Sequence, residues 1–175
     1  MAASTWVIDP THSEIQFKVK HLVISTVTGS FKSFEGTVTT ESEDFDGATV
    51  AFSADTTSID TNQAQRDEHL KSADFFETEK YPKISFTGTL AKKGSDSYIL
   101  SGDLTVKDVT KPFAFDVEYG GNMTDFYGNN KSGFEISGKI NRKEFGLTWG
   151  AVTEAGGVVV GDDVKLIANV QVVKQ

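Results

Sequence analysis

The sequence contains no cysteine, which excludes disulfide bridges, thiolate metal ligands and a cysteine nucleophile. Positive charge is also scarce, since 17 Lys and Arg stand against 25 Asp and Glu, for a formal net charge of -8 at pH 7. A phosphate backbone is bound by clusters of basic residues, and none interrupts this acidic background. Nucleic acid is therefore not an expected partner, and attraction to anionic lipid headgroups at a membrane surface is disfavoured.

Long apolar runs are missing as well. No stretch approaches the roughly 18 apolar residues that indicate a membrane-spanning helix, so stable membrane insertion is not expected. The N-terminus lacks the basic segment followed by an apolar one that is typical of a secretory signal peptide. We expect a cytoplasmic protein as the chain is written, or a periplasmic or secreted one if the chain is the trimmed mature form of a precursor.

What the sequence does have is a repeated alternation of apolar and polar residues, typical of β-strands with one buried face. At 15–20, for example, Ile, Phe and Val alternate with Gln and Lys. About eight such runs predict an all-β sandwich or closed barrel in a single domain, 1–175, with turns at 94–96, 107–108 and 120–122. The other runs are 27–31 and 34–38, separated by an apparent bulge, then 48–54, 84–90, 98–106, 113–119, 134–140 and 164–172.

One segment departs from this pattern. Between Asp60 and Tyr81 the apolar spacing relaxes and good helix formers appear. The sequence predicts one or two short helices at residues 60–80, capped by Asp60 or Thr61 and stopped by Pro82. They would cover a mouth or a flank of the barrel.

Glycines recur in phase with the apolar face of the strands, and two interpretations are open. An inward glycine either leaves room for a ligand or lets a strand bend where a small barrel closes. Bending is favoured at any single position, although together the glycines are compatible with a partly empty interior. They are Gly29, Gly36, Gly88, Gly102 and Gly138.

One end of this interior combines polar residues with an apolar wall. If neighbouring strands pair in chain order, His21 and Arg142 lie at the same end, beneath the helical segment and a loop that contains Trp149. That end suits the polar or anionic head of an elongated ligand whose apolar tail enters the barrel. The candidate ligand-binding residues are Phe17, Val19, His21, Phe31, Phe52, Phe86, Leu104, Phe115, Ile136, Arg142 and Trp149.

Signatures of catalysis are few. The histidines His12, His21 and His69 are not spaced as a helical metal site, and no nucleophile elbow, P-loop or dinucleotide fingerprint occurs. We expect no enzymatic activity, no metal and no cofactor. Two alternatives to a binding protein stay open. One is an enzyme that uses His12, His69 and carboxylates to modify a lipid or small molecule, and the other is a structural barrel with a filled core.

Several short motifs occur in order along nearly the whole chain. They are WVIDPTHS at 6–13, SIDT at 58–61, RDEHLKS at 66–72, DFF at 74–76, GDLTV at 102–106, VTKP at 109–112 and INR at 140–142. On these motifs the chain resembles the YceI-like family of polyisoprenoid-binding proteins. The resemblance implies a lipocalin-like, extended eight-stranded antiparallel barrel without enzymatic activity.

The same resemblance implies a ligand and a role. The barrel interior would bind and carry or sequester a long isoprenoid lipid, either a polyprenyl lipid or an isoprenoid quinone. Family members are often periplasmic, and a role in transport or in the stress response is implied. Related folds often dimerise, which leaves a homodimer open.

Overall fold

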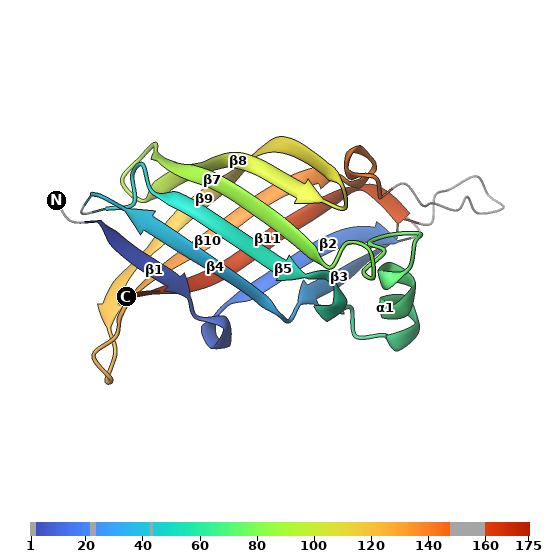
Figure 1. The fold of residues 1–175 in the computed structure, drawn as a ribbon, viewed down its shortest axis with the longest axis horizontal. Coiled ribbons are helices and arrows are strands. Elements are labelled where there is room, and N and C mark those ends of the chain that lie inside the picture. The colour runs from blue at the N-terminus through green and yellow to red at the C-terminus, as the bar shows by residue number, and fades with distance from the viewer. Residues whose placement is uncertain (1–2, 22–23, 43, 148–159) are drawn as a thin grey trace.

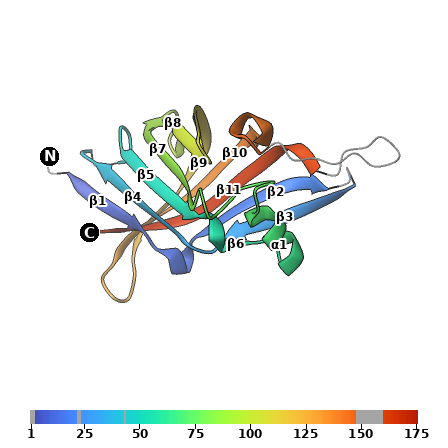
Figure 2. The same cartoon turned by 45° about the vertical axis from the view of Figure 1, so that its right-hand side comes forward.

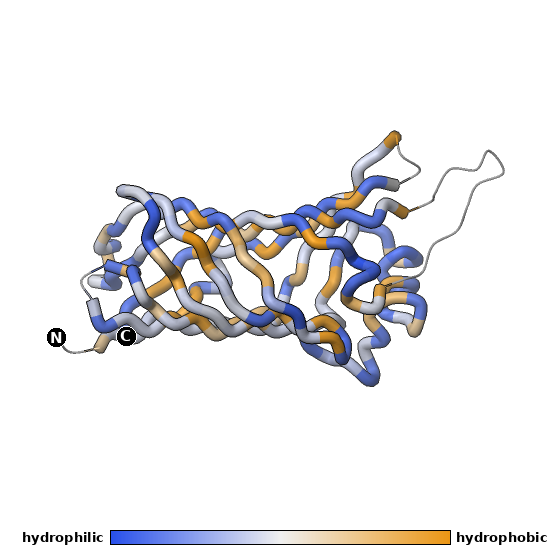
Figure 3. The backbone as a smooth tube through the Cα atoms, turned by 90° about the horizontal axis from the view of Figure 1, so that it is seen from above, coloured by the Kyte–Doolittle hydropathy of each residue, from blue (hydrophilic) through white to orange (hydrophobic). Residues whose placement is uncertain are grey.

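The computed structural model describes residues 3–21, 24–42, 44–147 and 160–175, most of which form one antiparallel β-sheet (Figure 1). Apolar and polar residues alternate along its strands (Figure 3). The strands are β1 Ser4–Ile8, β2 Glu14–His21, β3 Ser25–Phe31, β4 Phe34–Thr40, β5 Thr49–Asp55, β6 Ile59–Asp60, β7 Lys83–Lys92, β8 Ser97–Val106, β9 Val109–Thr124, β10 Asn130–Asn141 and β11 Val160–Lys174. The helix is α1 Ala64–Lys71, and the 3-10 turns are η1 Pro10–His12, η2 Thr56–Ser58 and η3 Arg142–Phe145.

The sheet closes on itself. Strands β1, β4, β5, β7, β8, β9, β10 and β11 pair in that order, and β1 also pairs with β11. Beside this ring, β2 pairs with β11 and with β3, while β3 pairs with the short β6. β1 and β2, separated by η1, pair with successive stretches of β11, at 172–174 and at 160–169. The predicted eight-stranded antiparallel barrel is therefore confirmed.

The barrel is elongated, and its two ends differ (Figures 1 and 2). Helix α1 lies at one end together with η3 and the last residues of β2, while β1 begins and β11 ends at the other. We refer to these as the helix end and the terminal end. The predicted short helix is confirmed as α1, which stops at Lys71, well before Pro82. Within the described residues, no helix combines the length and apolar character needed to cross a bilayer.

The predicted cap of this helix is wrong. The helix follows Gln63 instead of Asp60 or Thr61, because Asn62 has a φ of 67° and turns the chain before the helix can start. The Asp67 carboxylate, inside the first turn, accepts a hydrogen bond of 2.8 Å from the backbone amide of Thr61. A side chain of α1 thus holds the backbone of the segment that precedes the helix.

The predicted turn at 120–122 is also wrong, whereas the chain does reverse at 94–96 and at 107–108. Strand β9 runs through Gly120 and Gly121, where its register with β10 shifts between Gly133 and Phe134. Gly121 has a φ of 118°, which accommodates one extra residue in the strand. The hairpin between β9 and β10 instead turns at 125–129.

The space beside each inward glycine is filled by neighbouring strands and side chains, so these positions themselves hold no space for a ligand. Gly88 and Gly102 face each other across β7 and β8, and a Cβ on Gly102 would lie only 1.9 Å from the carbonyl oxygen of Thr87. A Cβ on Gly29 would lie 2.3 Å from the ring of Phe17. Of the two interpretations of these glycines, close strand packing and bending is therefore the one that the structure supports.

Candidate ligand-binding cavity

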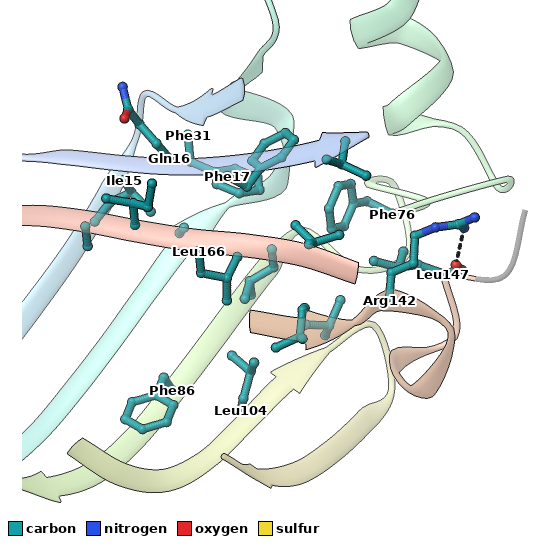
Figure 4. A pocket seen from close by; sticks show the side chains of 18 of the residues that line it. Ile15, Gln16, Phe17, Phe31, Phe76, Phe86, Leu104, Arg142, Leu147 and Leu166 are labelled. Atoms are coloured by element: carbon teal, nitrogen blue, oxygen red, sulfur yellow. Dashed lines mark hydrogen bonds between the residues drawn. The ribbon is translucent and has the colours of Figure 1, made fainter. Parts of the chain in front are cut away.

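The barrel interior encloses a cavity of about 320 Å³ at the helix end (Figure 4). Nine of the eleven predicted ligand-binding residues line it. Contact of these nine with a ligand stays a prediction, while Trp149 and the side chain of His21 lie outside the described residues. The nine are Phe17, Val19, Phe31, Phe52, Phe86, Leu104, Phe115, Ile136 and Arg142.

Phenylalanine rings stiffen the cavity wall. Phe17 and Phe31, on neighbouring strands, have ring centroids 5.7 Å apart, and Phe86 and Phe115 have centroids 5.3 Å apart. Phe76, from the segment after α1, packs edge-on against Phe31 at 5.9 Å. Such contacts add to the burial energy and fix the rings in place. The wall is therefore an ordered apolar surface to which both the barrel and the helical segment contribute.

The polar residues of the wall are basic or neutral. Arg66 and His69 of α1 and Arg142 of η3 lie at the helix end, whereas the side chains of Gln16 and Lys20 alternate with those of the inward-facing Phe17 and Val19. Among the described residues of the lining there is no Asp or Glu, although the chain carries a net charge of -8. Carboxylates lie just behind two of these basic groups, Asp74 beside His69 and Asp162 beside Arg142.

Arg142, at the start of η3, is only 3% exposed. Its guanidinium donates hydrogen bonds to the carbonyl oxygens of Leu147 at 2.6 Å (Figure 4), Gly161 at 2.8 Å and Val160 at 3.3 Å. Burial lowers the pKa of Arg142, and the negative charge of Asp162 opposes that shift. Arginine keeps its charge at any physiological pH, so the fork of donors ties η3 to the start of β11.

Helix α1 contributes two side chains to which the sequence analysis assigned no role in ligand binding. Arg66 and His69 are three residues apart, so they share a helix face with Leu70, which also lines the cavity. Arg66 donates to Thr61 through Nε, at 2.7 Å to Oγ1, and through Nη2. In the described part of the chain, its Nη1 makes no hydrogen bond. The shared spacing of Arg66, His69 and Leu70 is the sequence signal for this cavity-facing side.

The two histidines of the enzyme alternative are not brought together. His12 lies outside the cavity, where its Nδ1 is 2.8 Å from Oδ2 of Asp9. His69 lines the cavity, and its Nε2 is 2.8 Å from Oδ2 of Asp74. No cluster of three His, Asp or Glu side chains that could hold a metal ion occurs among the described residues. The described residues thus form an apolar cavity and keep His12 and His69 apart.

Comparison with known proteins places this fold and cavity in a family. The model of the YceI-like domain matches residues 6–172. The chain belongs to the YceI-like family. Protein YceI of Escherichia coli O17:K52:H18 is 40% identical over 164 residues, which cover 94% of this chain and 83% of that protein.

Solved structures of relatives agree with the fold. The YCEI protein of Campylobacter jejuni is 31% identical, with a TM-score of 0.75 over 89% of this chain and 90% of that one. A polyisoprenoid binding domain from Saccharophagus degradans, implicated in plant cell wall breakdown, matches with a TM-score of 0.69 at 15% identity. That match covers 100% of this chain and 99% of the domain. At such low identity it supports the YceI-like fold and no more.

Proposed function

We propose that this protein binds a long isoprenoid lipid in its cavity and carries or sequesters it. The observation that carries the proposal is the cavity itself, which has an apolar wall along an elongated barrel and basic side chains at one end. Burial of an apolar tail there contributes about 25 cal/mol per Å² removed from water. A cavity of about 320 Å³ favours this proposal over the alternative of a structural barrel with a filled core.

A polyprenyl lipid or an isoprenoid quinone fits the shape and polarity of this cavity. The cavity runs along several strands of an elongated barrel, among them β8 with 10 residues and β9 with 16, so the enclosed space favours a long tail over a compact ligand. The head of the ligand would lie at the helix end, near Arg66 and His69. Membership of the YceI-like family supports this ligand class.

Native mass spectrometry of protein purified from its own host tests the proposal directly. The expected result is a mass excess that corresponds to one lipid per chain and that organic extraction releases as a prenyl lipid or quinone. Protein that carries no lipid and also rejects added isoprenoids would contradict the proposal. In that case the enzyme alternative would have to be reconsidered, with turnover of candidate small molecules as its measure.

The polar end of the cavity gives a prediction for Arg66→Ala. We expect this variant to bind a prenyl phosphate about tenfold more weakly, because a charge-assisted hydrogen bond from Nη1 to the phosphate is lost. Binding of the corresponding neutral prenol should change little. Fluorescence titration or calorimetry with the two ligands measures both affinities, and thermal unfolding of the variant checks that the bonds to Thr61 are not needed for folding.

Lys139→Ala is the matched control. Lys139 lies on β10 but is largely exposed and pairs with Asp163 instead of lining the cavity. The Lys139→Ala substitution removes one positive charge, as Arg66→Ala does, so any general electrostatic effect on an anionic ligand appears in both variants. Equal losses for phosphate and prenol in Arg66→Ala would argue against a headgroup contact by this side chain.

A further inference from the structure

The terminal end of the barrel is blocked by aromatic side chains. Phe45, in the segment 44–48 that leads into β5, packs into the barrel interior and is 5% exposed. Its ring centroid lies 4.9 Å from that of Phe134, 5.2 Å from that of Trp6 and 6.0 Å from that of Tyr119. Phe45 thus sits at the centre of an aromatic cluster drawn from three strands, which we call the floor.

The floor begins where the cavity ends. On β10, Ile136 lines the cavity and Phe134, two residues nearer the terminal end, belongs to the floor. On β8, Leu100 lines the cavity, and Tyr98, two residues nearer the terminal end, is fully buried. Two residues along a strand keep the same face and advance roughly 7 Å. The cavity and the floor are therefore consecutive layers of one interior.

The backbone that presents Phe45 is fixed independently of its ring. Gly47 donates a hydrogen bond of 2.8 Å to the carbonyl of Leu90, and the amide of Leu90 donates one of 2.9 Å to Ala48. The amide of Lys92 donates to Oδ1 of Asp46 at 2.9 Å. These bonds hold residues 46–48, directly after Phe45, against β7. Removal of the ring would therefore deepen the cavity without releasing the loop.

We propose that Phe45, at the centre of the floor, sets the longest tail that the cavity can enclose. This inference rests on the proposed function. Each isoprene unit that enters the barrel adds buried apolar surface and therefore affinity, until the tail meets the floor. Further units must stay in water and add nothing. The phenyl ring of Phe45 is slightly larger than one isoprene unit, so its removal makes room for about one more.

The experiment measures the affinity of a series of all-trans prenols of increasing length for the wild type and for Phe45→Ala. For the wild type, affinity should rise with length and then reach a plateau. In Phe45→Ala the plateau should begin one unit later, and the first longer prenol should gain on the order of tenfold in affinity. Phe126→Ala is the matched control, because Phe126 is fully exposed in the hairpin at 125–129 and its loss should leave the plateau unchanged.

The outcomes separate this inference from the proposed function. A wild type that binds no prenol overturns the proposed function. A wild type with a plateau that does not move in a folded Phe45 variant overturns the role of the floor alone. Phe45→Leu keeps an apolar contact and is expected to fold, with a smaller shift in the same direction, so it decides the question if Phe45→Ala unfolds. Near-ultraviolet circular dichroism verifies the packing of the remaining aromatic residues in each variant.

Discussion

Arg142→Ala is expected to lower the free energy of unfolding by about 3 to 5 kcal/mol, because it removes one partner from a buried, charged hydrogen-bond network. The three carbonyl groups that accept from the guanidinium would lose their donor, and the buried volume of the side chain would be left empty. At roughly 2 to 4 °C per kcal/mol for a chain of this size, the melting temperature should fall by about 10 °C. Urea and thermal denaturation measure the two quantities.

Two further variants test whether the loss of stability comes from the hydrogen bonds of the buried guanidinium. Lys143→Ala, at the next position, removes a half-exposed cation that pairs with Asp162, and it should cost less than about 0.5 kcal/mol. Arg142→Lys keeps the charge but cannot reach three carbonyl groups with a planar fork, so most of the loss should remain. A stability of Arg142→Ala within about 1 kcal/mol of the wild type would contradict the argument, since water would then be satisfying the carbonyl groups.

The same geometry bears on the headgroup contact predicted for Arg142. Its guanidinium already donates to three backbone carbonyl groups, which hold it against the segment after η3 and the start of β11. Arg66 carries a donor without such a partner in the described part of the chain. The contact by Arg142 stays a prediction, and we expect the larger discrimination between phosphate and alcohol from Arg66.

The barrel could be predicted because its pattern is local. Strand alternation fixes which face of each run must be buried, and a chain with many such runs buries them by closing a sheet. Phase also explains why residues as far apart in the chain as Phe17 and Ile136 were both assigned to the interior. To assign a residue to the barrel interior, it is enough to know which face of its own strand is buried. The order in which the strands pair is not needed.

Phe45 and Arg66 could not be found in this way, because tertiary contacts decide their positions. Phe45 stands among acidic residues in a loop with no periodicity, and it is turned inward by the bonds of that loop to Leu90 and Lys92. From the sequence alone, Arg66 belongs to a charged helix face that would be exposed to solvent. Only the structure shows that Arg66 lines the cavity together with Leu70. Gly121 shows a different limit, because a glycine with positive φ serves a turn and a strand bulge equally well.

Ala168→Trp is expected to weaken binding of any long prenyl ligand on the order of a hundredfold. Ala168 lies on β11 opposite Ile136 of β10 and Ile15 of β2, and all three line the cavity. An indole at this position would occupy the space that the ligand tail needs, so the burial that drives binding would be lost. Because the ring enters an existing cavity, the melting temperature should change little. Titration with a prenol and thermal unfolding measure the two effects.

Ala114→Trp provides the comparison. Ala114 is exposed on the outer face of β9, opposite Ser101 of β8, so the same side chain is added to the barrel without entering it. This variant should bind as the wild type does. If the folded Ala168→Trp protein also bound with wild-type affinity, the ligand would have to lie outside the barrel. A loss confined to Ala168→Trp locates the tail between β10, β11 and β2, on the path that leads from Arg66 at the helix end to Phe45 at the floor.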